Sequence, residues 1–97
     1  MHARVSTIEG SADQVDAGIS SFRDNVVPFT REAGGKGSLL LTDRQTGKVI
    51  AITLWENEDA LRASEAKGNE LRAQAATTAG TAQAPTVERY EVAVFEI

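Results

Sequence analysis

The sequence has 97 residues, of which 41% are apolar and 25% charged, with a net charge of −4 and no cysteine. This length suits one domain, 1–97, and the composition excludes a disordered chain. The scattered positive charges argue against a nucleic-acid partner, and the lack of a long apolar run argues against a membrane partner. Without cysteine or an apolar signal core after Met1, a cytoplasmic location is expected.

Residues 2–9 alternate between two sets of side chains, which predicts a first strand that ends at Gly10. The next four residues form a capping box, in which Ser11 and Gln14 are expected to cap each other's amides at a helix start. Pro28 is expected to kink or tighten this helix before it stops at 33–35. One apolar stripe identifies the helix: Val15, Ile19, Phe22 and Val26.

Two further strands, 38–42 and 49–55, are expected to form an antiparallel hairpin, with Gly47 at a turn position that tolerates positive φ. Asn57 then caps a second helix. Gly68 weakens that helix by about 1 kcal/mol relative to alanine, so we expect another group to pack closely against it. A long last strand is predicted over 86–97, with apolar residues on both sides.

The predicted order is strand, helix, strand, strand, helix, strand. Right-handed crossovers place both helices on one face of a four-stranded antiparallel sheet, an α+β, ferredoxin-like fold. The other face has no element to cover it, yet the third strand is apolar on both sides, with Ile50, Ile52 and Leu54 on one of them. We therefore expect a homodimer through the helix-free sheet face. The alternative is a monomer with an unusually apolar exposed sheet.

Two segments carry a resemblance to a known family. A strand that ends in Trp55-Glu56-Asn57-Glu58-Asp59-Ala60, and a last strand that begins Val87-Glu88-Arg89-Tyr90-Glu91-Val92, resemble the antibiotic-biosynthesis monooxygenase-like family of the dimeric α/β-barrel superfamily. The resemblance implies a dimeric α/β barrel with a ligand pocket between sheet and helices in each subunit. It also implies that Trp55 lies in or near that pocket. The superfamily includes a haem-degrading branch that needs a histidine on the second helix, and 58–79 contains none.

Several residues are candidates for the pocket, each with a structural alternative. Trp55 is either a substrate contact or a core aromatic that anchors the sheet to the second helix. Tyr90 either holds or deprotonates a substrate or packs across strands. Arg4 either steadies a substrate anion or pairs with Glu88 or Glu91 on a neighbouring strand. Three residues of the first helix form either a pocket wall or plain core: Phe22, Val26 and Phe29.

The residue patterns that other kinds of site require are absent from this sequence. His2, the single histidine, is interpreted as a mobile terminal side chain rather than a general base, since no carboxylate partner is evident in sequence. No cluster with metal-ligand spacing is present, and no cofactor is expected. The glycine-rich segment 34–37 follows a helix and precedes a strand, the reverse of a phosphate loop, so it is interpreted as a helix stop.

Two functions of different classes remain. The first is a cofactor-independent monooxygenase or related oxidoreductase that acts on a small aromatic or quinol-type molecule, with Trp55, Tyr90 and Arg4 in the pocket. The second is a non-catalytic homodimer that binds a small apolar or aromatic ligand or has a structural role. The missing acid–base cluster favours the second function, and the family resemblance favours the first.

Overall fold

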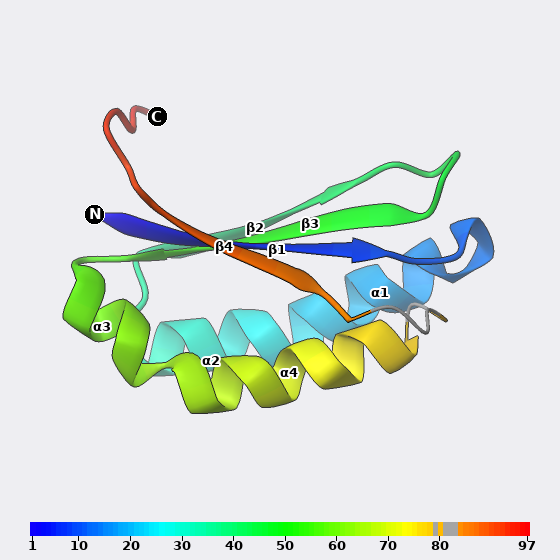
Figure 1. Cartoon of the computed structure of the whole chain (residues 1–97), viewed down its shortest axis with the longest axis horizontal. Helices are drawn as coiled ribbons and strands as arrows, with labels where there is room; N and C mark the ends of the chain where they lie inside the picture. Colours follow the sequence, from blue (N-terminus) through cyan, green and yellow to red (C-terminus); the bar gives the residue numbers. More distant parts are fainter. Residues whose placement is uncertain (79, 81–83) are drawn as a thin grey trace.

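The computed structural model describes residues 1–78, 80 and 84–97. Its sheet has the order β2-β3-β1-β4, and each neighbouring pair is antiparallel (Figure 1). The arrangement confirms the predicted ferredoxin-like α+β fold. The strands are β1 (His2–Glu9), β2 (Gly37–Thr42), β3 (Lys48–Trp55) and β4 (Thr86–Glu91).

The helices form one layer that covers a single face of the sheet (Figure 1). Among the described residues, no helix combines the length and apolar character needed to cross a bilayer. Along the chain the helical segments are η1 (Ala12–Gln14, a 3-10 turn), α1 (Val15–Ser21), η2 (Phe22–Val26, a π turn), α2 (Val27–Glu32), α3 (Glu58–Ala63) and α4 (Glu65–Thr78).

The first helical region differs from the prediction at both ends of α1. The capping box is wrong: the Ser11 hydroxyl contacts the Asp13 carboxylate, and the Gln14 amide donates to the Ser11 carbonyl at 2.9 Å. The expected change near Pro28 takes the form of η2, where the Val27 amide donates to the Phe22 carbonyl five residues back. Because proline lacks an amide, the regular ladder has no donor at that point, and the helix resumes as α2.

The second helical region begins as predicted and then divides. The Asn57 side chain accepts a hydrogen bond from the Ala60 amide at 2.8 Å, which confirms the cap. One continuous helix was expected, but α3 ends before Ser64, whose hydroxyl donates to the Leu61 carbonyl at 2.7 Å. A local bond of this kind competes with the helical ladder, so α4 starts in a new direction.

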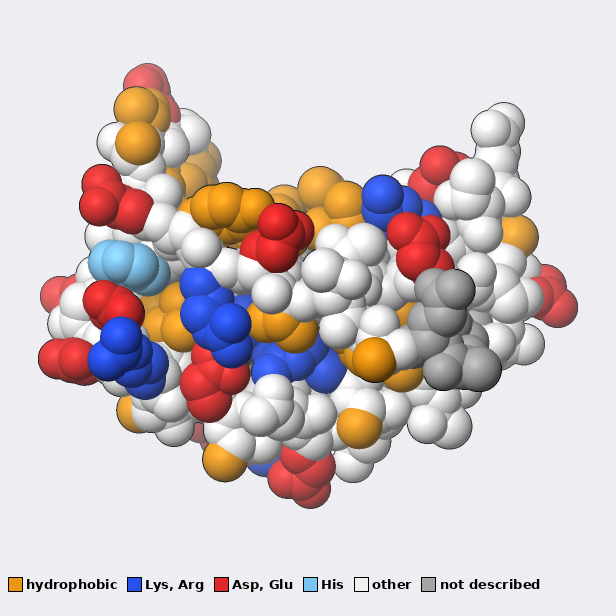
Figure 2. Space-filling view, in the orientation of Figure 1, with side chains coloured by type: hydrophobic (Ala, Val, Ile, Leu, Met, Phe, Trp, Pro, Cys, Tyr) orange, Lys and Arg blue, Asp and Glu red, His pale blue; other side chains and the backbone are white. Residues whose placement is uncertain are grey.

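The two faces of the sheet are both rich in apolar side chains, as predicted. One set of β1 side chains (Arg4, Ser6 and Ile8) is buried toward the helices. On the opposite face, a saddle of apolar side chains lies between the hairpin turn and the C-terminal segment (Figure 2). By register and exposure the saddle comprises Val5, Leu39, Leu41, Ile50, Ile52 and Tyr90.

The last strand is shorter than predicted, because β4 ends at Glu91 rather than Ile97. The Val92 amide still donates to the Met1 carbonyl at 2.9 Å. β1 itself begins at His2, which lies opposite Glu91. The following segment, 93–97, therefore leaves the sheet on the side away from the helices (Figure 1).

Candidate functional site

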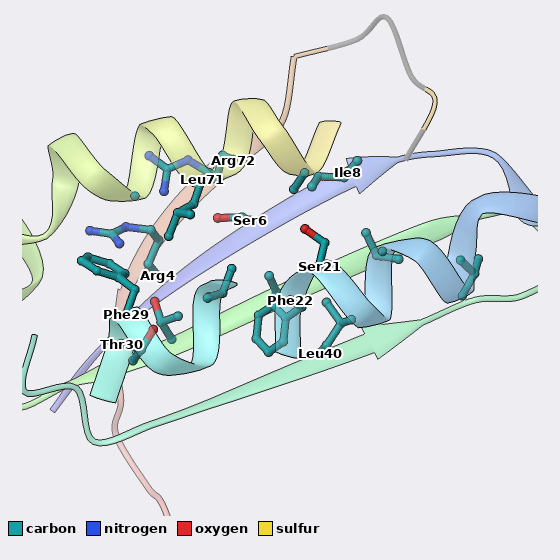
Figure 3. A pocket seen from close by; sticks show the side chains of 18 of the residues that line it. Arg4, Ser6, Ile8, Ser21, Phe22, Phe29, Thr30, Leu40, Leu71 and Arg72 are labelled. Carbon is teal, nitrogen blue, oxygen red and sulfur yellow. The ribbon is translucent and has the colours of Figure 1, made fainter. Parts of the chain in front are cut away.

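A cavity of about 70 Å³ lies between the sheet and the helix layer. Its walls come from β1, β3, α1, η2, α2 and α4, and most of its lining is apolar (Figure 3). This free volume is well below the ~300–1,000 Å³ of pockets that bind drug-sized ligands, so it limits any ligand to a single small ring. The apolar side chains around it include Ile8, Val15, Phe22, Val26, Phe29, Leu40, Trp55 and Leu71.

Most of the candidate residues from the sequence lie around this one cavity. Trp55 and Arg4 come from neighbouring strands, and the first helical region supplies the three apolar candidates. The grouping of Tyr90 with them is a correction: its position opposite Ala3 turns it to the helix-free face, where its side chain is 51% exposed. There its hydroxyl donates to Glu88 at 2.6 Å, which raises the pKa of the phenol.

Trp55 is both a core residue and part of the cavity wall. Its side chain is fully buried, and its indole N–H donates to the Thr53 hydroxyl at 3.0 Å. The Arg4 guanidinium lies 5.8 Å from the centre of the ring, within the range of a cation–π contact. Alternating strand positions place Thr53 and Trp55 on the same face, so β3 orients the ring by itself.

Arg4 is held in place by the second helical region, not by β4. Its Nη2 atom donates to the Leu61 carbonyl at 2.8 Å and to the Ser64 hydroxyl at 2.9 Å, and lies 3.2 Å from a Glu65 oxygen. The expected pairing with Glu88 or Glu91 is wrong. Antiparallel register sets Arg89 opposite Arg4, so the partner has to come from the helix layer.

Glu65 is the centre of a charged cluster that includes three arginines. Its carboxylate lies 2.7 Å from Arg89, 3.2 Å from Arg4 and 3.6 Å from Arg72. The hydrogen bond from Arg89 does most to lower the pKa of Glu65, to about 2, and the charge of Arg4 adds to it against the opposing effect of burial. Burial lowers the pKa of Arg4, yet a guanidinium remains protonated. The cluster therefore has an excess of positive charge beside the cavity.

Three residues of the site were not predicted from the sequence: Arg72, Glu65 and Thr30. Arg72 reaches the cavity from α4 and Thr30 from α2 (Figure 3). The Thr30 hydroxyl is buried, and no described residue forms a hydrogen bond with it. A polar residue within an apolar stripe was the only signal for Thr30. Nothing in local sequence links Glu65 to Arg4, because the two lie far apart along the chain.

His2 is fixed in the sheet, which corrects its interpretation as a mobile terminal residue. It pairs with Trp55 and Glu91 from β1, and its Nδ1 atom is buried with no hydrogen-bond partner among the described residues. It lines an open surface cleft of about 330 Å³ with Arg62 and Arg89, separate from the cavity between sheet and helices. Within 1–78, 80 and 84–97, no group of three or more histidine or acidic side chains is arranged to hold a metal ion.

Comparisons of sequence identify relatives whose roles are not known. No family model matches the chain. Two uncharacterized proteins of Mycobacterium tuberculosis are 41% identical over 97 residues and 36% identical over 96 residues, and each alignment covers 98% of this chain. The chain spans only about 40% of the length of these relatives.

Comparisons of structure identify solved proteins that share the fold of this chain. A monooxygenase from Streptomyces coelicolor, solved in complex with the ligand Nanaomycin D, superposes with a TM-score of 0.76 at 17% identity, over 99% of this chain and 92% of that one. The chain has the antibiotic biosynthesis monooxygenase fold. Another protein with this fold, a cofactor-independent oxygenase from Streptomyces nogalater in mutant form, superposes at 0.67 with 21% identity, over 97% and 94% of the two chains.

The fold also occurs in a protein described as dimeric. This ferredoxin-like protein from an uncultured marine organism superposes with a TM-score of 0.69 at 7% identity, over 99% of this chain and 90% of that one. At such low sequence identities, the likeness to these structures shows a shared fold and nothing more. The chemistry of this chain has to be argued from its own cavity.

Proposed function

We propose that this protein is a cofactor-independent monooxygenase that acts on a small, single-ring quinol or similarly electron-rich aromatic molecule. The observation that carries the proposal is the cavity: apolar walls with one fixed guanidinium, from Arg4, at the level of the Trp55 ring. Apolar walls suit an aromatic ring and dissolved oxygen. The guanidinium suits the anion that forms when the ring loses a proton.

The reaction that fits needs only the substrate and O2. A hydroquinone loses a proton to water, and Arg4 stabilises the resulting anion. The anion passes one electron to O2, and the two radicals combine to form a carbon–oxygen bond on the ring. Loss of the ring C–H proton then breaks the O–O bond, which gives a hydroxyquinone and one water. The ring supplies all four electrons, so the role of the protein is to bind, orient and stabilise charge.

The test uses methylhydroquinone, ¹⁸O2 and a metal chelator, with a protein-free sample to measure autoxidation. We expect O2 uptake above that background and a quinone product that contains one ¹⁸O atom. Val26→Phe, which fills the cavity from η2, should abolish both while the circular dichroism spectrum stays unchanged. Product without ¹⁸O, or equal activity in Val26→Phe, would contradict the proposal.

The second candidate is a non-catalytic protein that binds a small aromatic ligand. One observation favours it: among the described residues, no histidine or carboxylate side chain lines the cavity, so no general base is in place. In the same experiment this function predicts quenching of Trp55 fluorescence by the ligand with no O2 uptake above background.

We also propose that the protein is a homodimer through the helix-free sheet face. The apolar saddle supports this assembly, since a patch of this kind is costly to leave in water. The C-terminal segment adds exposed Val94, Phe95 and Ile97 beside it. A second copy related by a twofold axis would cover both.

Ile52→Asp tests the dimer by placing a charge at the middle of the saddle. We expect light scattering to give a mass near twice 10.3 kDa for the unmodified protein and a shift to monomer or aggregate for Ile52→Asp. Ala73→Asp, on an exposed position of α4, is the matched control and should keep the dimer. A monomeric unmodified protein at all concentrations would refute this assembly.

A further inference from the structure

The positively charged end of the cavity has more cationic groups than the proposed oxidation requires. Arg4 and Arg72 lie next to each other at this end, beside α4 (Figure 3). With Arg89 they share the one carboxylate of Glu65, so two positive charges remain unbalanced. Like charges repel each other, so the two charges that Glu65 does not balance favour a second anion at this end of the cavity.

Gly68 allows both guanidinium groups to lie close against α4. A Cβ atom at this position would lie 3.0 Å from Nη1 of Arg4 and 3.2 Å from Nη1 of Arg72. Both nitrogens therefore converge on one point next to the helix, although glycine is unfavourable within a helix. This confirms the expectation that a group packs closely against Gly68.

Part of the Arg4 side chain has no partner within the protein. The side chain is only 4% exposed, and its contacts to Leu61, Ser64 and Glu65 all use Nη2. Its Nε atom is buried, and among the described residues nothing accepts a hydrogen bond from it. A buried donor without an acceptor is costly, so the site favours a ligand that brings its own oxygen atoms.

We infer that this end of the cavity is a subsite for a carboxylate on the aromatic ligand, bound by Arg4 and Arg72 where both lie against Gly68. This inference rests on the proposed function and narrows its substrate to ring carboxylates. A carboxylate has two oxygens and matches the planar donors of two guanidinium groups. It is also ionised at neutral pH, before any oxidation step.

Benzoate and benzamide form the test pair, since they share one shape and differ in charge. Calorimetric titration of the full chain should show benzoate binding about tenfold more tightly, the effect of one charge-assisted contact. Arg72→Gln should remove this preference and leave the affinity for benzamide unchanged. Arg62→Gln, which removes an exposed guanidinium from α3, is the matched control and should retain the preference.

Gly68→Ala separates a binding role from a purely structural one. The added Cβ would lie 3.0 Å from Nη1 of Arg4 and 3.2 Å from Nη1 of Arg72, so both guanidinium groups should shift and the preference for benzoate should be lost. An intact preference in a Gly68→Ala variant with an unchanged circular dichroism spectrum would overturn the role of Gly68 and with it the subsite.

The remaining outcomes distinguish the two proposals. Equal binding of benzoate and benzamide would overturn the carboxylate subsite and leave the aromatic cavity standing. Failure of both to bind, together with absence of O2 uptake, would overturn the proposed function as well. Inorganic phosphate that binds as tightly as benzoate would show a general anion site rather than one for ring carboxylates, which also overturns the inference.

Discussion

Glu65→Gln should lower the free energy of unfolding by about 2–3 kcal/mol at pH 7. The carboxylate is the common partner of Arg4, Arg72 and Arg89. Its removal leaves the buried Arg4 charge with neutral partners only. Half of Arg89 is exposed, so solvent screens its contact with Glu65. The loss of stability is therefore smaller than the free energy that corresponds to the full pKa shift of Glu65.

The same residue predicts how stability depends on pH. The pKa of Glu65 falls from an ordinary 4.5 to about 2 in the folded protein. A lowered pKa contributes stability that is complete above about pH 4.5 and is lost as the pH falls toward 2. Across that window the free energy of unfolding should fall in the unmodified protein and should fall less in the Glu65→Gln variant. The difference in stability between the two proteins should therefore shrink at low pH.

Urea unfolding followed by Trp55 fluorescence, at one fixed protein concentration, measures both effects. Glu70→Gln is the matched control, because Glu70 is an exposed carboxylate on the same helix that forms an ion pair with Lys67. We expect it to change stability by less than about 0.5 kcal/mol. If the two variants lost the same amount, Glu65 would have no special role in the cluster.

The fold was predictable because local pattern and global architecture agree in this chain. Alternation in 2–9 and 49–55, together with the stop at 33–35, fixes the order of the elements, and the order leaves few topologies. Gly47 has φ of 84° at its turn, as its position suggested. The double-sided apolar pattern of β3 also appears in the structure.

Details that depend on distant contacts were not predictable from local pattern. The break at Ser64 exists because its hydroxyl serves both the Leu61 carbonyl and Arg4. The end of β4 depends on the register with β1, which sets His2, the first residue of that strand, opposite Glu91. In both cases a partner remote in sequence decides the local structure.

Part of the site was predictable, because strand alternation decides which side chains share a face of the sheet. Trp55 and Arg4 were identified from their position on strands, and strand alternation turns both toward the helices. Tyr90 was misplaced, because the register of β4 sets it on the opposite face. Arg72 and Glu65 were missed because each is an ordinary charged residue on a helix. Only the packed structure shows that both lie beside the buried Arg4.

Trp55→Ala should lower the free energy of unfolding by about 3–5 kcal/mol, since it leaves a large void in the core. The ring is fully buried and its N–H has the Thr53 hydroxyl as acceptor. Thr53→Val should cost about 1–3 kcal/mol by leaving that N–H without a partner. Urea unfolding followed by circular dichroism measures both changes, because the variant has no other tryptophan. A loss below about 1 kcal/mol for Trp55→Ala would contradict its core role.

The alanine variant does not separate the two roles of Trp55, because a destabilised core also disturbs the cavity. Trp55→Phe does separate them: phenylalanine keeps an apolar ring near Arg4 and should cost less stability than alanine. If Trp55 contacts the ligand, this variant should fold and bind benzoate more weakly, since both the indole area and its N–H are gone. Unchanged affinity in a folded Trp55→Phe variant would assign Trp55 to the core alone, and the aromatic wall of the cavity would then come from Phe22 and Phe29.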